Sequence, residues 1–301
     1  MRRSIKIVVI AAAGLLAIVL LLALLAGWLS ERKRTRVIEL TVAPVAFVSD
    51  EAALKRGKYL YDSRGCMECH GADGGGREVV NDPGGMFVKS PNISPGPGSV
   101  VKGYTETEWV RTIRHGVSAK KHPLFLMPSG DYNRMTDADL ASLVAYVRSL
   151  PPASGGDAVI RFPPLVKALY AFGAIKDDVE VINHALPPTV AIAESISVEH
   201  GGYVANLCKG CHGDGFSGGK IPGTPPDWPP AANLTPGGDS AMLRYENAEK
   251  FSAMLRTGKR PDGSAVSAVM PFATLRNLND TDAGALYLFL KTLPARPAGG
   301  R

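Results

Sequence analysis

Cys66-Met67-Glu68-Cys69-His70 (CMECH) is one of two short stretches that hold all four cysteines of this 301-residue chain, and Cys208–His212 (CKGCH) is the other. Both stretches have the frame Cys-x-x-Cys-His, and a glycine follows each. A chain with so little cysteine that places every thiol in the same five-residue frame uses its thiols for one chemical purpose, twice.

The two frames belong to a longer internal repeat. Cys66 and Cys208 lie 142 residues apart, PNISPG at 91–96 returns as ANLTPG at 232–237 after 141, and Met127-Pro128 returns as Met270-Pro271 after 143. From these prolines onward 24 residues align without a gap, PSGDYNRMTDADLASLVAYVRSLP on PFATLRNLNDTDAGALYLFLKTLP. The near-constant offset indicates a tandem duplication.

Each half is predicted to be mostly helical. Thr136 can cap a helix whose apolar residues share one face and which ends at Pro151. Thr105 and Glu108 form a capping box for a helix that closes at Gly116. The glycine- and proline-rich stretches before these helices are expected to be long loops that wrap around something. The sequence therefore predicts an all-α fold.

The repeat and its flanks predict the domain limits, which are an anchor at 1–30, a tether at 31–49, a first domain at 50–152, a linker at 153–190 and a second domain at 191–296. The anchor rests on the uncharged run Ile7–Leu29, which is long enough to cross a bilayer. A cleaved signal peptide is the alternative, but its apolar core is usually shorter and ends in a small-x-small site. Positive residues flank the run on both sides, so charge alone does not orient it.

The net charge of +6 belongs mostly to the N-terminus, since residues 1–49 contribute +5. The rest of the chain is nearly neutral. This distribution argues against a nucleic-acid partner, which would require a basic surface on the body.

Four uses of the cysteines compete. A disulfide within each pair would close too small a loop to stabilise the fold. A zinc site needs four ligands, but 138 residues separate the inner cysteines. A thioredoxin-like pair lies near a βαβ pattern, which is absent, and needs no histidine. Cys-x-x-Cys-His is the attachment frame of c-type haem, in which the histidine binds the iron. Two haem c groups, each with its iron, are therefore predicted.

These motifs carry a family resemblance. Each half resembles a class I cytochrome c domain in CMECHG and CKGCHG, in PNISPG and ANLTPG, in FLMPS and VMPFA, and in the terminal helices ending in SLP and TLP. The whole chain resembles membrane-anchored dihaem cytochromes c, including the cytochrome subunits of periplasmic alcohol and aldehyde dehydrogenases. The resemblance implies a single-pass protein of the cytoplasmic membrane with its haem domains in the periplasm. It also implies a redox donor and acceptor, such as a dehydrogenase, a soluble cytochrome or a terminal oxidase.

The second axial ligand of each iron is predicted from the symmetry of the repeat. Met127 lies 57 residues beyond His70, Met270 lies 58 beyond His212, and both precede proline. His115 and His122 remain alternatives for the first iron. The other methionines either lack a repeat counterpart or are expected to pack, namely Met67, Met86, Met135, Met242 and Met254. The predicted haem-binding residues are Cys66, Cys69, His70, Met127, Cys208, Cys211, His212 and Met270, and both histidines and both methionines bind iron.

The predicted function is electron transfer in a respiratory or dehydrogenase-linked chain. The alternative is an enzyme, either a dihaem peroxidase or a haem thiol oxidase, which requires one iron with an open position. Tyr59 and Tyr203 are candidate neighbours of the haems, and His184 and His200 are expected at the surface. The sequence shows no catalytic Ser/His/Asp set, so an electron carrier is favoured over an enzyme.

Overall fold

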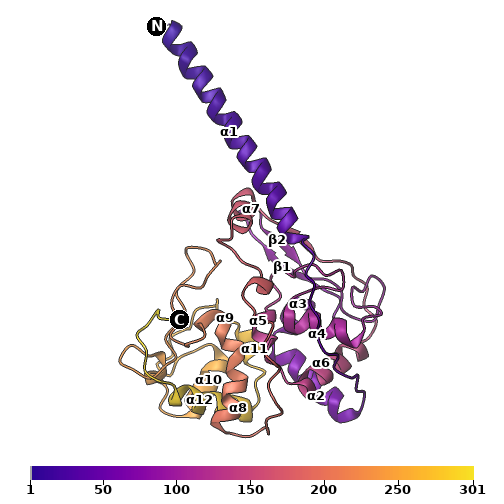
Figure 1. Ribbon diagram of the computed structural model, residues 1–301. Coiled ribbons are helices and arrows are strands. Elements are labelled where there is room, and N and C mark those ends of the chain that lie inside the picture. Colours follow the sequence, from indigo (N-terminus) through magenta and orange to yellow (C-terminus); the bar gives the residue numbers. More distant parts are fainter. Residues whose placement is uncertain (1) are drawn as a thin grey trace.

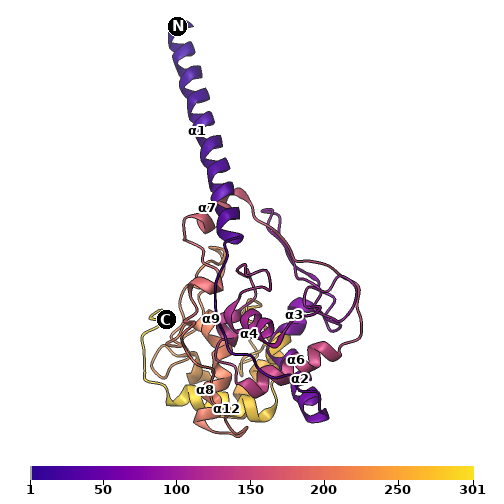
Figure 2. The same ribbon diagram turned by 45° about the vertical axis from the view of Figure 1, so that its right-hand side comes forward.

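The computed structural model describes residues 2–301, with side chains from Arg3 onward. A single helix, α1 (Arg2–Arg34), stands away from a body in which two helical units lie side by side (Figure 1). By length and composition α1 can cross a membrane, and every residue from Arg3 to Leu25 is exposed. The same arrangement is visible after rotation (Figure 2).

The two units are built from equivalent helices. The first contains α2 (Glu51–Ser63), α3 (Cys66–His70), α4 (Glu106–His115), α5 (Ser129–Tyr132) and α6 (Asp137–Ser149). The second contains α8 (Val198–Val204), the 3₁₀ helix η2 (Ala205–Cys208), α9 (Lys209–His212), the 3₁₀ helix η3 (Ala241–Arg244), α10 (Ala248–Thr257), α11 (Phe272–Leu275) and α12 (Asp280–Thr292). The helices α4, α5 and α6 recur with unchanged lengths as α10, α11 and α12, as the tandem repeat requires.

The predicted capping residues begin their helices. The Thr105 side chain accepts from the Glu108 backbone, and Glu108 accepts from the Thr105 backbone, which completes the capping box of α4. Thr136 caps α6 by accepting from the Asp139 backbone. Gly116 ends α4 in the left-handed region at φ 66°, where glycine is favoured because it has no Cβ.

A glycine in each unit lets the first and last helices cross at close range. A Cβ atom on Gly57 of α2 would lie 2.0 Å from the carbonyl oxygen of Ser142 in α6. A Cβ atom on Gly201 of α8 would lie 2.0 Å from the carbonyl oxygen of Ala285 in α12. No other residue type fits at either crossing without moving a helix, so these two glycines set the shape of each unit.

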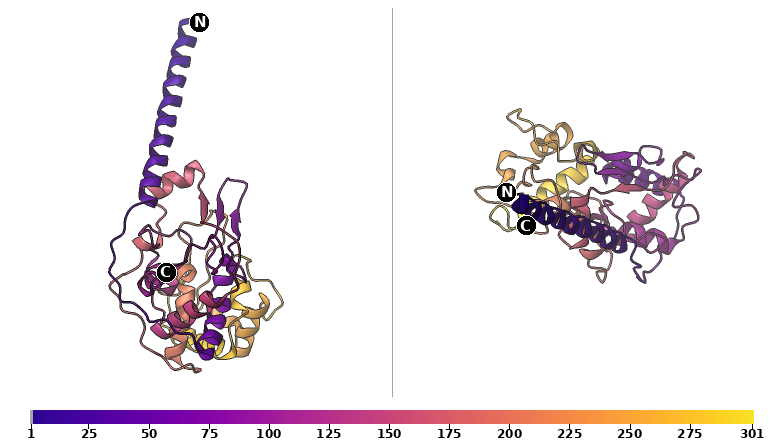
Figure 3. Two further views of the ribbon diagram at one scale, coloured as in Figure 1. Left: turned by 90° about the vertical axis from the view of Figure 1, so that its right-hand side faces the viewer. Right: turned by 90° about the horizontal axis from the view of Figure 1, so that it is seen from above.

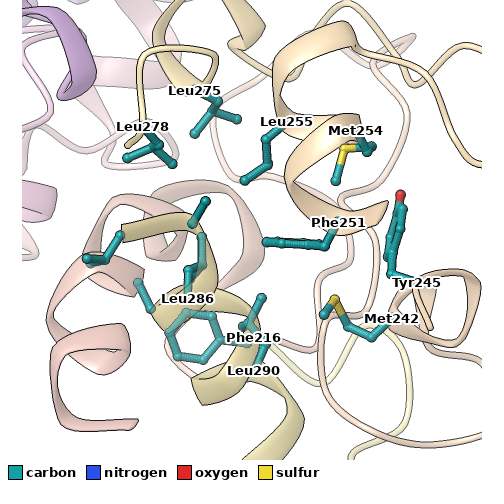
Figure 4. Packing of buried hydrophobic residues seen from close by; sticks show 13 residues of the cluster. Phe216, Met242, Tyr245, Phe251, Met254, Leu255, Leu275, Leu278, Leu286 and Leu290 are labelled. Atoms are coloured by element: carbon teal, nitrogen blue, oxygen red, sulfur yellow. The ribbon is translucent and has the colours of Figure 1, made fainter. Parts of the chain in front are cut away.

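Each unit has its own hydrophobic core. In the second unit α10 contributes Phe251 and Leu255, and α12 contributes Leu286 and Leu290 (Figure 4). Met254 packs in this core, as expected from its place on an amphipathic helix. In the first unit the corresponding residues come from α4 and α6.

A small antiparallel sheet was not predicted. The strands β1 (Glu78–Asn81), β2 (Phe87–Lys89) and β3 (Val159–Arg161) pair in the order β1-β2-β3. Two of them lie in the first glycine-rich stretch, and the third begins the linker. The matching stretch of the second unit contains only an isolated bridge between Gly219 and Ala231 among its described residues.

The linker also forms α7 (Pro164–Ala171) and the 3₁₀ helix η1 (Asp178–Glu180). Helix α7 packs against the end of α1, where the long helix meets the body (Figure 3).

Candidate haem sites

Each Cys-x-x-Cys-His frame forms a single helical turn between two glycine- or loop-defined ends. Gly65 precedes α3 at φ 85°, and Gly71 follows it at φ 80°. The second frame runs from the end of η2 into α9 and is closed by Gly213 at φ 78°. The turn holds the two thiols and the imidazole of each frame next to one another, and none of the four cysteines forms a disulfide.

The histidine of each frame is held by its Nδ1 atom. Nδ1 of His70 lies 3.1 Å from the Pro91 carbonyl oxygen, and Nδ1 of His212 lies 2.8 Å from the Ala232 carbonyl oxygen. A carbonyl oxygen can only accept, so Nδ1 carries the hydrogen and Nε2 keeps its lone pair for a metal. Burial lowers the pKa of both histidines, which favours this neutral form. The donor set therefore fits haem iron.

The repeated PNISPG and ANLTPG motifs position these carbonyl groups. Asn92 donates to the Ala153 carbonyl oxygen and accepts from the Ser94 backbone. Asn233 donates to the Arg296 carbonyl oxygen and accepts from the Thr235 backbone in the same way. Each asparagine thus ties the loop that holds the histidine to the chain beyond the last helix of its unit.

The cysteines are protonated in this structure. Burial, and secondarily the neighbouring Cys69, raises the pKa of the Cys66 thiol to about 12. Burial, with the charge of Asp131, raises the pKa of the Cys208 thiol to about 12. Such thiols are poor redox nucleophiles, since the thiolate is the reactive form. Within residues 2–301 no group of three or more His, Cys, Asp or Glu side chains could hold a metal ion.

Met127 and Met270 occupy matching turns. The Ser129 backbone donates to the Met127 carbonyl oxygen and the Phe272 backbone donates to the Met270 carbonyl oxygen, both at 2.8 Å. The proline between has φ −79° and ψ 62° in the first unit and φ −78° and ψ 69° in the second, an inverse γ-turn. Met127 packs on the core that Cys66 contacts, and Met270 packs on the core that Cys208 contacts.

The alternative histidines have other contacts. Nδ1 of His115 lies 3.0 Å from Nδ1 of His184, and burial, together with His184 and Arg114, lowers the pKa of His115 to about 4. Nδ1 of His122 lies 3.3 Å from the Arg36 carbonyl oxygen. His115 is therefore packed in the fold, and His184, expected at the surface, is half-buried beside it.

Tyr59 and Tyr203 join the two units. The Tyr59 hydroxyl donates to Asp282 at 2.6 Å, and the Tyr203 hydroxyl donates to Asp139 at 2.7 Å. Each aspartate lies in the first turn of the last helix of the other unit, so the contact has approximate two-fold symmetry. The sequence gave no signal for these pairs, because the partners are 223 and 64 residues apart.

Asp282 also pairs with two buried bases. Arg64 donates to it at 2.8 Å, and the His200 Nε2 atom lies 2.7 Å away. His200 was expected at the surface, but it is buried with an exposure of 2%. Burial alone would raise the pKa of Asp282, but Arg64, Tyr59 and His200 outweigh this effect and hold it below its ordinary value.

The attachment helices lie at this contact. Helix α3 contacts α11, and α9 contacts α5, so each frame touches the helix that follows the methionine of the other unit. The Asp131 carboxylate of α5 accepts from the Gly210 backbone inside the second frame at 3.2 Å. The positive charge of Arg64 acts on both Cys66 and Cys208, so this side chain is positioned between the two frames.

Comparison with known proteins assigns both units. A family model described as cytochrome c oxidase, cbb3-type, subunit III matches residues 52–147, and the cytochrome c family model matches residues 201–294. The chain is 25% identical over 283 residues to the fructose dehydrogenase cytochrome subunit of Gluconobacter japonicus, covering 86% of this chain and 56% of the relative.

Two further relatives are similar. The gluconate 2-dehydrogenase cytochrome c subunit of Pantoea cypripedii is 25% identical over 280 residues, which covers 83% of this chain and 62% of the relative. A dihaem cytochrome c-type protein of Cereibacter sphaeroides is 31% identical over 127 residues, 38% of this chain and 42% of the relative. The chain thus spans less than two thirds of the length of these relatives. Together with the two attachment frames, the matches identify the chain as a c-type cytochrome with two cytochrome c domains and two haem c groups.

Proposed function

We propose that the protein is an electron carrier in which His70 and Met127 bind the first haem iron, and His212 and Met270 bind the second. The observation that carries this proposal is the matched pair of Nδ1 contacts at His70 and His212, since each leaves Nε2 as the lone-pair donor. The matched inverse γ-turns after Met127 and Met270 support the methionines.

The chain holds each group through residues of one unit. Each haem, when bound, supplies a one-electron couple at its iron. Cys66 and Cys69 would form the thioethers of the first site, and Cys208 and Cys211 those of the second. A methionine sulfur favours the reduced state of the iron, so this ligand set gives relatively high potentials.

Arg64 connects the electrostatics of the two sites. It is 5% exposed, is neutralised by Asp282 at 2.8 Å, and acts on a cysteine of each frame. A buried cation near a redox centre favours the state with the extra electron. Arg64 would therefore raise the potential of both irons and keep them close enough for transfer in either direction.

The donor in this proposal is a dehydrogenase, because the relatives that cover most of this chain are named cytochrome subunits of fructose and gluconate dehydrogenases. The acceptor would be a soluble cytochrome or a terminal oxidase. Helix α1 would anchor the protein in the cytoplasmic membrane with the body in the periplasm, where haem is attached to cytochromes of this kind.

A redox titration tests the carrier function. The purified protein should take up two electrons per chain and return them to an added one-electron acceptor, and it should turn over peroxide slowly. Rapid peroxide or thiol turnover by the wild-type protein would favour an enzyme with one open iron site. The donor is tested by measuring reduction of the protein by membranes that contain, or lack, the dehydrogenase encoded beside its gene.

A further inference from the structure

Helix α7 meets α1 at the end of the apolar run. Along α1 the described residues are exposed as far as Leu25, whereas Ala26 and Ser30 are buried at 4% and 3% exposure. These two small residues are one helical turn apart and lie on one face, so they admit a close neighbour. Helix α7 is the element that packs on this part of α1. The contact therefore begins inside the run Ile7–Leu29.

Buried polar contacts fix the height of α7 relative to α1. Lys33 donates to the Tyr170 carbonyl oxygen at 3.0 Å and pairs with Glu180 at 2.8 Å. Arg36 makes two bonds to Asp177, at 2.7 and 2.8 Å, and Tyr170 donates to the same carboxylate at 2.7 Å. A bidentate pair with a buried carboxylate restricts both rotation and translation. The linker is thus attached firmly to the end of α1.

The opposite side of this segment is apolar and uncovered. Leu165 and Phe172 are each 70% exposed, and Leu169 is 38% exposed. Their spacing of four and three residues places them along one face of α7 and its C-cap. Trp28 and Leu25 of α1 are also exposed at the same level. Figures 1 and 3 show that α7 lies at the end of the body from which α1 emerges.

We infer that α7 lies in the interface of the bilayer that α1 spans, with Leu165, Leu169 and Phe172 in contact with lipid. The inference rests on the proposed membrane anchor. The occupant is a lipid surface because the apolar face continues from the membrane-spanning run and cations lie beside it. Exposed Lys167 and Arg32 can reach lipid phosphates while their stems cover apolar surface. This second contact would fix the orientation of both haem domains relative to the membrane.

Thiol labelling in a bilayer tests the contact. Since thioethers would occupy all four native cysteines, L165C and F172C each introduce one free thiol into the full haem-loaded chain. The variants are placed in nanodiscs of phosphatidylcholine and phosphatidylglycerol, and the rate of modification by a charged, water-soluble thiol reagent is followed by mass. L20C reports the bilayer interior, and K291C on exposed α12 reports water.

We expect L165C and F172C to react several-fold more slowly than K291C, while an uncharged reagent modifies them all. Equal rates at positions 165, 172 and 291, with L20C protected, would overturn the inference and leave the anchor intact. If L20C reacts as quickly as K291C, the proposed anchor is wrong and the inference fails with it.

A second measurement follows the orientation of the body. In oriented bilayers, electron paramagnetic resonance of the ferric protein should give a narrow distribution of haem orientations. The L165Q/F172Q double variant should broaden this distribution, whereas L243Q, the same kind of change at an exposed leucine of η3, should not. Identical distributions in the wild type and the double variant would contradict a lipid contact at α7.

Discussion

The Tyr59 hydroxyl of the first domain donates a 2.6 Å hydrogen bond to Asp282 of the second, and its counterpart Tyr203 donates a 2.7 Å bond to Asp139 of the first. Each tyrosine hydroxyl also accepts from the backbone at the N-cap of the same helix, at Asn279 and Thr136. Duplication therefore supplied both sides of the domain contact. The first and last helices of each domain were already available as donor and acceptor.

Removal of either tyrosine hydroxyl should weaken the domain contact. Y59F and Y203F each leave a buried carboxylate with one donor fewer, which should cost about 1.5–3 kcal/mol of unfolding free energy. Urea denaturation monitored by circular dichroism measures the loss. Y146F is the matched control, because the hydroxyl of the half-buried Tyr146 has no hydrogen-bond partner among the described residues. An equal loss in Y146F would show that the contact contributes nothing specific.

The domain contact should also weaken in acid. Arg56 and Tyr203 hold the pKa of Asp139 below its ordinary value despite burial, and Arg64, Tyr59 and His200 do so for Asp282. A carboxyl group with a lowered folded pKa stabilises the fold fully above its unfolded value of 3.8. That stability is lost as pH falls through the folded pKa.

Urea unfolding between pH 7 and pH 3 measures this dependence. The wild type should lose stability below about pH 4, and the D139N/D282N variant should start less stable but show a flatter profile. Parallel profiles for the two proteins would mean that other carboxyl groups govern the acid transition.

The glycine crossings should tolerate no side chain. G57A and G201A place a methyl group on a backbone carbonyl, so the helices must separate, at a cost of about 3 kcal/mol or more. Loss of haem from the affected domain should accompany the change and is measured by intact mass. G14A is the control, since a Cβ atom there has nothing within 4 Å. Normal stability in G57A would mean that α2 and α6 can shift without consequence.

Much of this architecture is readable from the sequence, and the reasons are local. The attachment frames, the capping box at Thr105 and the cap at Thr136 are specified by residues within a few positions of one another. The strands β1–β3 escaped prediction because segments of three or four residues carry too short a pattern of alternation. Tyr59–Asp282 and the α1–α7 contact escaped because tertiary pairing leaves no periodic signal in a single chain.

Arg64 should set the potentials of both haems. R64M removes a buried cation and leaves Asp282 with less compensation, so both midpoint potentials should fall. R64K keeps the charge and should retain potentials closer to those of the wild type. Spectroelectrochemical titration measures both values. A fall at one haem only would show that Arg64 acts on a single site and does not couple the two.

The ligand sets are tested most directly by the near-infrared absorption and magnetic circular dichroism of the oxidised wild-type protein, compared with M127A and M270A. The account predicts two low-spin irons, each with a sulfur-to-iron charge-transfer band. Each variant should lose half of that band, gain one high-spin iron and bind carbon monoxide at that site. A wild-type spectrum with one high-spin iron, or with two histidines on one iron, would contradict His/Met ligation and leave His115 or His122 as the ligand to examine.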